Sequence, residues 1–198
     1  MLQLIFATNN PHKVEEIRSV ISNCFTLMSL KEAGIHIEIP EPHETLAENA
    51  IEKSTTIFTL TGKNCFSEDT GLEVNALNGE PGVKSARYAG DDASSSDNIT
   101  KLLGHMENKS DRSARFRTVI SLILEGKYYL FQGVCEGRIT EQISGNDGFG
   151  YDPVFIPEGS DVTFGEMNMK QKNMFSHRKK AVNQLIDFLT LYNAKNKN

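Results

Sequence analysis

Several features that mark particular classes of protein are missing from this sequence. Its 198 residues include 21 Lys or Arg and 26 Asp or Glu, a formal net charge of −5. The sequence therefore has neither the basic excess nor the basic stripe that binds a nucleic-acid backbone. An anionic small substrate would be repelled by this overall charge, so it would need local cations or a metal ion.

Cysteine is scarce, and long apolar runs are absent. The three cysteines, Cys24, Cys65 and Cys135, lie far apart, and no Cys/His cluster has zinc-site spacing. We expect reduced core thiols, which are typical of a cytoplasmic protein. The first residues lack the basic start and apolar stretch of a signal peptide. The longest apolar runs, such as residues 119–124, are too short to span a bilayer, so no membrane partner is expected.

The sequence does contain a regular alternation of strand and helix patterns. Strands are expected at residues 2–7, 25–28, 36–39, 64–67, 114–125, 127–140 and 153–156. Helices are expected at residues 11–22, 46–60 and 96–106 and after Ser176. Early β/α units followed by a hairpin predict an α/β fold with a mixed sheet. We expect one domain over residues 1–193, with residues 194–198 as a frayed tail.

The most informative segment is Ser67-Glu68-Asp69-Thr70-Gly71-Leu72-Glu73-Val74. Two adjacent carboxylates beside a core strand are unfavourable unless cations or hydrogen-bond donors meet them. A divalent metal ion or an activated water would meet that need, so the segment indicates a catalytic centre. An ordinary acidic turn is the alternative interpretation.

Basic residues occur where a helix dipole disfavours them. Lys13 lies in the first turn of the helix that follows Thr8-Asn9-Asn10-Pro11-His12, where backbone N–H groups attract phosphate. His177 and Arg178 occupy the same position in the last helix, and Lys172 precedes them. A bound anion would explain them, as would an electronegative base carbonyl beside His177 and Arg178. A capped helix with solvated basic residues is the alternative.

Two further segments contain candidate binding groups. In Gly148-Phe149-Gly150-Tyr151-Asp152-Pro153, glycines permit close backbone approach and aromatic rings offer a flat face to a nucleobase. Asp152 would accept hydrogen bonds from a base edge or hold a neighbouring loop. Around residues 41–53, Glu41 would reach a metal ion shared with Asp69, and Lys53 shares a helix face with Asn49.

Taken together and in order, these segments resemble the inosine triphosphate pyrophosphatase family, over nearly the whole chain. The matching motifs are Thr8-Asn9-Asn10-x-x-Lys13, Glu48-Asn49-Ala50-x-x-Lys53, Glu68-Asp69-Thr70-Gly71-Leu72, Pro81-Gly82-Val83-x-Ser85-Ala86-Arg87-Tyr88, Gly148-Phe149-Gly150-Tyr151-Asp152-Pro153 and Ser176-His177-Arg178. Each motif alone is weak, but six in sequence are specific.

The resemblance implies hydrolysis of ITP, dITP and XTP to the monophosphate and pyrophosphate. It also implies magnesium dependence, a homodimer, and an elongated two-lobed fold with a central mixed β-sheet flanked by helices and a cleft between the lobes. A nucleotide-binding sensor without turnover would not need the Glu68-Asp69 pair, and a nucleic-acid-binding module disagrees with the charge balance.

Site residues follow from the same resemblance. The resemblance implies Asp69 as general base and Glu41 with Asp69 as the acidic metal site, and places Glu68 where the family has an acidic neighbour. Because Mg²⁺ prefers oxygen ligands, Glu68 is a third candidate ligand, and Lys13 and Lys53 are candidate catalytic residues that stabilise developing charge. The substrate-binding residues implied are Thr8, Asn9, Asn10, Pro11, His12, Lys13, Thr70, Phe149, Gly150, Tyr151, Asp152, Lys172, His177 and Arg178. One stretch departs from the family pattern, because Pro42 follows Glu41, so Glu38 or Glu44 is an alternative metal ligand.

Overall fold

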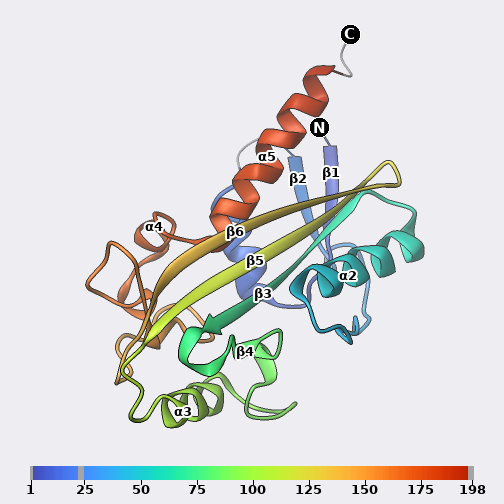
Figure 1. Cartoon of the computed structure of the whole chain (residues 1–198). Helices are drawn as coiled ribbons and strands as arrows, with labels where there is room; N and C mark the ends of the chain where they lie inside the picture. The colour runs from blue at the N-terminus through green and yellow to red at the C-terminus, as the bar shows by residue number, and fades with distance from the viewer. Residues whose placement is uncertain (1, 22–24, 196–198) are drawn as a thin grey trace. The chain divides into compact units, whose positions relative to one another are not determined.

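The structure is a computed structural model that describes residues 2–21 and 25–195 (Figure 1). Its helices are α1 (Pro11–Arg18), α2 (Leu46–Thr61), α3 (Ser95–His105), α4 (Met169–Lys172) and α5 (His177–Lys195). Its strands are β1 (Leu2–Phe6), β2 (Phe25–Ser29), β3 (Cys65–Val74), β4 (Pro81–Gly82), β5 (Ser113–Leu124), β6 (Lys127–Ile139) and β7 (Phe155–Pro157).

The strands form one mixed sheet in the order β2-β1-β3-β5-β6-β7, with β4 paired to β3. β1 pairs in parallel with both β2 and β3, whereas β7 pairs antiparallel with β6. A tight turn at Glu125 and Gly126, both with positive φ, joins β5 to β6 as the sequence predicted. The predicted α/β class with a mixed sheet is therefore confirmed.

The chain divides into two compact units, each built from several segments. Unit 1 comprises Met1–Asp69, Thr118–Gly133 and Arg178–Asn198, and unit 2 comprises Thr70–Arg117 and Val134–His177. In unit 1, side chains of β1, α1 and α5 share a core in which the Phe6 and Phe66 rings stack at 4.5 Å. In unit 2, Phe116, Phe155 and Phe164 pack together. The single domain over residues 1–193 stays a prediction.

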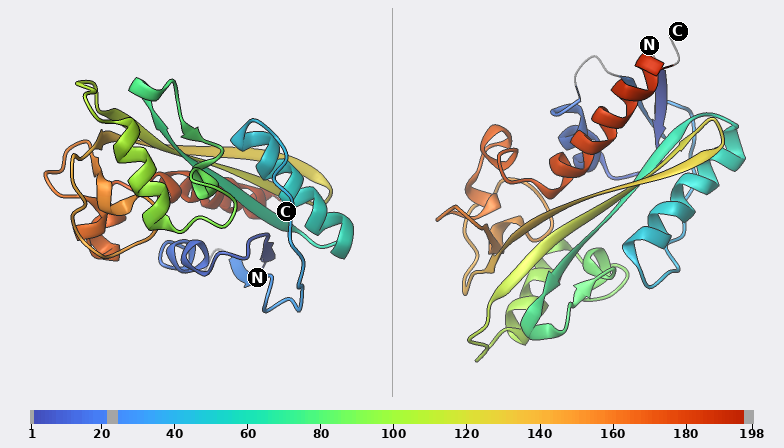
Figure 2. Two further views of the ribbon diagram at one scale, coloured as in Figure 1. Left: turned by 90° about the horizontal axis from the view of Figure 1, so that it is seen from below. Right: turned by 45° about the horizontal axis from the view of Figure 1, so that its top comes forward.

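Local signals placed several elements well. Asn10 caps α1 by accepting hydrogen bonds from the backbone of His12 and Lys13, and Pro11 is its first residue. The hydroxyl of Thr45 caps α2 by accepting from the Glu48 amide. In unit 2, α3 lies beside the turn at residues 85–87 (Figure 2), where the Asn98 side chain bonds the backbone of both Ala86 and Ala89.

Four expected elements differ from the structure. The strand expected over residues 64–67 continues as β3 to Val74 and so includes the acidic residues. α1 ends at Arg18, not near residue 22, and the hydroxyl of the following Ser19 donates to the Glu16 carbonyl. Residues 36–39 form no strand: their alternation only packs Ile37 and Ile39 against a core cluster. The strand expected over residues 153–156 begins at Phe155, because residues 152–154 form a 3₁₀ turn. Residues 22–24 lie outside the described part of the chain.

The cysteines agree with the expected reduced state where they are described. Cys65 and Cys135 are buried and form no disulfide, and burial raises the pKa of the Cys65 thiol to about 12. Cys24 lies outside the described residues. No helix in the described ranges has both the length and the apolar character needed to cross a membrane.

Candidate active site

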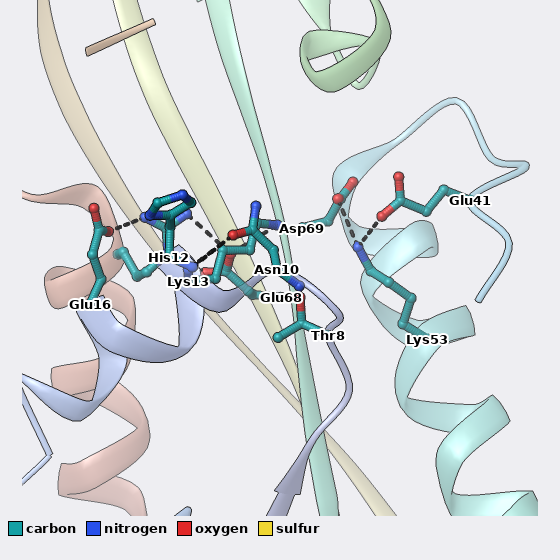
Figure 3. Close-up of polar contacts among 10 residues, drawn as sticks. Thr8, Asn10, His12, Lys13, Glu16, Glu41, Lys53, Glu68 and Asp69 are labelled. Carbon is teal, nitrogen blue, oxygen red and sulfur yellow. Dashed lines mark hydrogen bonds and ion pairs between the residues drawn. The ribbon is translucent and has the colours of Figure 1, made fainter. Parts of the chain in front are cut away.

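The acidic strand β3 presents its two carboxylates in opposite directions. Successive side chains of a strand point to opposite faces, so Glu68 and Asp69 meet different neighbours. Figure 3 shows Glu68 beside residues of α1 and Asp69 beside Lys53 of α2. Both residues are buried, with only 1% of Glu68 and 5% of Asp69 exposed. Neither carboxylate belongs to an ordinary surface turn.

Glu68 is held by cations on both oxygens. Arg178 donates from Nε to Oε2 at 2.7 Å and from Nη2 to Oε1 at 3.1 Å, while Lys13 Nζ lies 3.0 Å from Oε1. Arg178 also pairs through Nη1 with Glu16 of α1. Burial alone would raise the pKa of Glu68, but Arg178 and Lys13 outweigh it and hold that pKa well below its usual range.

Asp69 has a different environment. Lys53 Nζ donates to its Oδ1 at 2.9 Å and to Glu41 Oε1 at 2.5 Å (Figure 3). The other oxygen of Asp69, Oδ2, is buried without a hydrogen-bond partner. Burial therefore raises the pKa of Asp69, although Lys53 partly offsets it. The same two carboxylates raise the pKa of Lys53 against the effect of its own burial, so its ammonium stays charged.

The predicted metal ligands differ in how fully their oxygens are already bonded. Across the described ranges, no three His, Cys, Asp or Glu side chains gather as a ready-made metal site. Magnesium, however, is usually held by one or two carboxylates together with substrate phosphates. The unpartnered Oδ2 of Asp69 and the carboxylate of Glu41 fit that requirement. Glu68 fits it less well because both its oxygens hold cations. The two alternatives to Glu41 are Glu38 and Glu44, and both side chains are exposed.

The predicted phosphate-binding segment leads from β1 into α1. The Thr8 hydroxyl accepts from the Asn10 amide at 3.2 Å, and the Asn9 side chain donates to the Ile37 carbonyl. The first backbone N–H groups of α1, from His12 and Lys13, already bond the Asn10 side chain. An incoming phosphate would therefore compete with Asn10 for these donors.

The aromatic turn of unit 2 is organised by Asp152. Its Oδ2 accepts from the Phe149 amide at 2.8 Å and from Lys172 Nζ at 2.6 Å. The Lys172 ammonium also lies 5.1 Å from the centre of the Phe149 ring. At Gly148, φ is +77° and a Cβ would come within 2.1 Å of Asp152 Oδ2, so only glycine fits. Of the two roles open to Asp152, the structure shows that it holds the loop.

Other predicted binding residues have partners within the protein. The Tyr151 hydroxyl donates to the Ser85 carbonyl at 2.8 Å, and burial raises its pKa. The His177 ring stacks on Phe116 at 4.7 Å. Thr70 is half-buried on β3, and Gly150 has a positive φ of 61°.

The structure thus brings together three groups of predicted residues. Lys13, Glu68 and Arg178 form one group and Lys53, Glu41 and Asp69 another, both within unit 1. Phe149, Asp152 and Lys172 form the third, within unit 2. The Tyr151 hydroxyl and the His177 ring face other partners.

Two residues have roles that their local sequence did not predict, Glu16 and Ser85. Glu16 is buried and pairs with Arg178, 162 residues away in the chain. The only local signal was its place three residues after Lys13, on the same side of α1. Ser85 accepts from the Leu72 amide through Oγ and from the Tyr151 hydroxyl through its carbonyl. Its place in a Gly/Pro loop motif gave no indication of either bond.

Comparison with known proteins gives the family. The model of the Ham1 family matches residues 4–188. The chain belongs to the Ham1 family. This confirms the resemblance drawn from the six motifs, because the relatives are pyrophosphatases of the expected kind by name. A relative from Flavobacterium johnsoniae, named dITP/XTP pyrophosphatase, is 50% identical over 189 residues, which cover 96% of this chain and 98% of the relative.

Solved structures of Ham1 proteins have the same fold. The Ham1 protein of Coxiella burnetii is 36% identical with a TM-score of 0.88, covering 96% of this chain and 99% of that one. The Staphylococcus aureus Ham1 protein is 37% identical with a TM-score of 0.86, covering 95% and 98%. The α/β fold is therefore that of Ham1 proteins throughout nearly the whole chain.

Proposed function

We propose that this protein hydrolyses the noncanonical purine nucleoside triphosphates ITP, dITP and XTP to the monophosphate and pyrophosphate, and so removes them from the nucleotide pool. Membership of the Ham1 family supports this proposal, as do relatives named dITP/XTP pyrophosphatase. The observation that carries it is Asp69, a buried carboxylate with one unpartnered oxygen and a raised pKa.

In the proposed mechanism, water attacks the α-phosphorus and pyrophosphate leaves. The Asp69 carboxylate orients that water and takes up its proton, a role that a raised pKa favours near neutrality. Lys53 and Lys13 stabilise charge that develops on the phosphates, and electrostatic stabilisation is a dominant contribution in phosphoryl transfer. Glu68 and Arg178 position Lys13 through their ion pairs.

The proposal includes magnesium, with Glu41 and Asp69 as the protein ligands. Bound Mg²⁺ would neutralise phosphate charge and align the reacting groups. This choice is supported by two observations. Glu41 and Asp69 share one cation, Lys53, and one oxygen of Asp69 has no hydrogen-bond partner.

Base recognition is proposed for the Phe149–Asp152 turn, whose Phe149 ring offers a flat face beside the Lys172 ammonium. ITP and XTP carry a carbonyl at the six-position of the purine, where ATP carries an amino group. Hydrogen-bond donors of the protein that face this carbonyl would face the amino group of ATP, which is itself a donor, and would be left without an acceptor. An unpaired buried polar group costs about 1–3 kcal/mol, so a few such contacts give strong discrimination.

A pyrophosphate-release assay tests the proposed activity. ITP, dITP, XTP, GTP and ATP would each be incubated with the protein, with and without Mg²⁺, and both pyrophosphate and orthophosphate measured. We expect Mg²⁺-dependent release of pyrophosphate from ITP, dITP and XTP, and little from ATP. Binding without turnover would favour the nucleotide sensor, and equal efficiency on ATP and ITP would remove the explanation of specificity.

A homodimer and a cytoplasmic location complete the proposal. The two described cysteines are buried thiols outside any disulfide, which suits a reducing compartment. Exposed apolar side chains of unit 1, Leu60, Tyr128 and Leu130, suit a covered surface. Sedimentation equilibrium tests the dimer, because a mass near that of one 22.1 kDa chain would contradict it.

A further inference from the structure

Lys53 lies where a metal ion would otherwise join two carboxylates. Its ammonium is 2.9 Å from Asp69 Oδ1 and 2.5 Å from Glu41 Oε1 (Figure 3). The Lys53 side chain is only 6% exposed, so water contributes little to its solvation. The two carboxylates are therefore bridged by a cation that belongs to the chain itself.

The Lys53 bridge leaves one negative charge unbalanced and one carboxylate oxygen without a hydrogen-bond partner. Among these three side chains there are two negative charges and one positive charge, and Asp69 Oδ2 is buried without a hydrogen-bond partner. By contrast, both oxygens of the neighbouring Glu68 are bonded. Lys53 thus holds both carboxylates in place but leaves Asp69 Oδ2 without a hydrogen-bond partner.

We propose that Lys53 is an internal competitor for the metal: it holds Glu41 and Asp69 in the nucleotide-free protein and suppresses binding of free divalent cations there. This inference rests on the proposed function. When a nucleotide is present, its phosphates offer Lys53 a new acceptor, and the two carboxylates become available. Metal and nucleotide then bind together, so the site does not hold a metal ion without its substrate.

Electrostatics sets the expected size of the effect. An ammonium in direct contact with both ligands repels a divalent cation, and this repulsion weakens only partly with the effective dielectric near a protein surface. Replacing Lys53 by Met keeps a long unbranched side chain and removes the charge. We expect divalent cations to bind this variant at least about tenfold more tightly than wild type in the absence of nucleotide.

The test is a metal titration without nucleotide. Mn²⁺ would be titrated into wild type and Lys53→Met, with free Mn²⁺ followed by electron paramagnetic resonance, and Mg²⁺ binding measured by calorimetry. Lys63→Met is the matched control, because Lys63 is exposed and bonds no proposed ligand through its side chain. We expect weak binding by wild type and control, tight binding by Lys53→Met, and loss of that gain in Lys53→Met/Asp69→Asn.

A second readout covers a variant that folds poorly. Two facing carboxylates without their cation should lower the melting temperature of Lys53→Met, and added Mg²⁺ should restore it. The melting temperature of wild type should barely respond. Lys53→Gln repeats both measurements with another neutral side chain.

Equal metal affinity in wild type, Lys53→Met and Lys53→Gln would overturn the inference, as would tight Mn²⁺ binding by the nucleotide-free wild type. Neither result depends on turnover. A failed pyrophosphate assay with an intact Lys53 effect would instead count against the proposed function alone.

Discussion

Glu68 and Asp69 are adjacent on β3, yet their surroundings differ in nearly every respect. Glu68 joins a chain of alternating charges, Glu16–Arg178–Glu68–Lys13, in which both of its oxygens are bonded. Asp69 shares the single cation Lys53 with Glu41 and keeps a buried oxygen without a partner. Their pKa values move in opposite directions, down for Glu68 and up for Asp69.

This difference distinguishes a charged residue that stabilises the fold from one that is available to take part in a reaction. A buried ion pair with all its hydrogen bonds made resists change, because removing either partner leaves a charge unpaired. A buried carboxylate oxygen that lacks a hydrogen-bond partner is unfavourable for stability, and such exceptions concentrate at functional sites. We therefore propose that Glu68 holds the site together and that Asp69 takes part in its chemistry.

Removal of Arg178 should have the largest effect on stability. Arg178→Met leaves Glu16 and Glu68 buried without their common cation, so we expect a loss of about 3–5 kcal/mol in the free energy of unfolding. Urea denaturation followed by circular dichroism measures it. Arg18→Met is the control, because Arg18 forms an exposed pair with Glu32 and its removal should barely shift the midpoint. Equal shifts for the two variants would contradict the structural role of the Glu68 cluster.

Replacing Glu68 and Asp69 in turn should change the free energy of unfolding differently, and the two changes should depend differently on pH. Because the pKa of Glu68 is lowered on folding, its ionisation stabilises the protein above the unfolded-state pKa of about 4.3, and this contribution is lost as pH falls below that value. Glu68→Gln should therefore cost about 1–3 kcal/mol at neutral pH and flatten the acid-side loss of stability. The pKa of Asp69 is raised, so Asp69→Asn should not lower stability at neutral pH.

Urea denaturation midpoints of wild type, Glu68→Gln and Asp69→Asn, measured between neutral pH and about pH 3, test both expected stability changes. If Asp69→Asn were destabilised as much as Glu68→Gln at neutral pH, the two carboxylates would not differ in the way proposed.

The aromatic turn extends the comparison to unit 2 with a smaller effect. Asp152 and Lys172 form another buried ion pair, which holds the Phe149 amide. Gly148→Ala would place a Cβ against Asp152 at positive φ, so we expect a loss of more than about 1 kcal/mol and a raised KM for ITP. Gly34→Ala is the control, because it has the same sign of φ with open space around it. It should lose less stability, about 1 kcal/mol, and keep the wild-type KM.

The sequence predicted those parts of the fold and site that depend on local chemistry. Asn10 and Pro11 placed the start of α1, and the run from Ser67 to Val74 identified both carboxylates. Local pattern failed where tertiary contacts decide. Residues 36–39 alternate like a strand, but their apolar side chains pack on a core cluster without a neighbouring strand.

The charge pairing was also beyond local reasoning. Arg178 was expected to meet a bound anion or a base carbonyl, and its pairing with Glu68, 110 residues away in the chain, was not expected. Glu16 looked like any other acidic helix residue until its partner was known. Whether a charged side chain is buried and paired depends on elements that only the fold brings together. The assignment of these residues to substrate and metal binding stays a prediction.

Turnover of ITP by Asp69→Asn tests the central claim most directly. The rate of pyrophosphate release would be measured at saturating ITP and Mg²⁺, with circular dichroism to verify that the variant is folded. Asp69 as the group that activates water predicts a fall in kcat of about 10² or more with the fold intact. A folded Asp69→Asn protein that releases pyrophosphate at close to the wild-type rate would contradict the account.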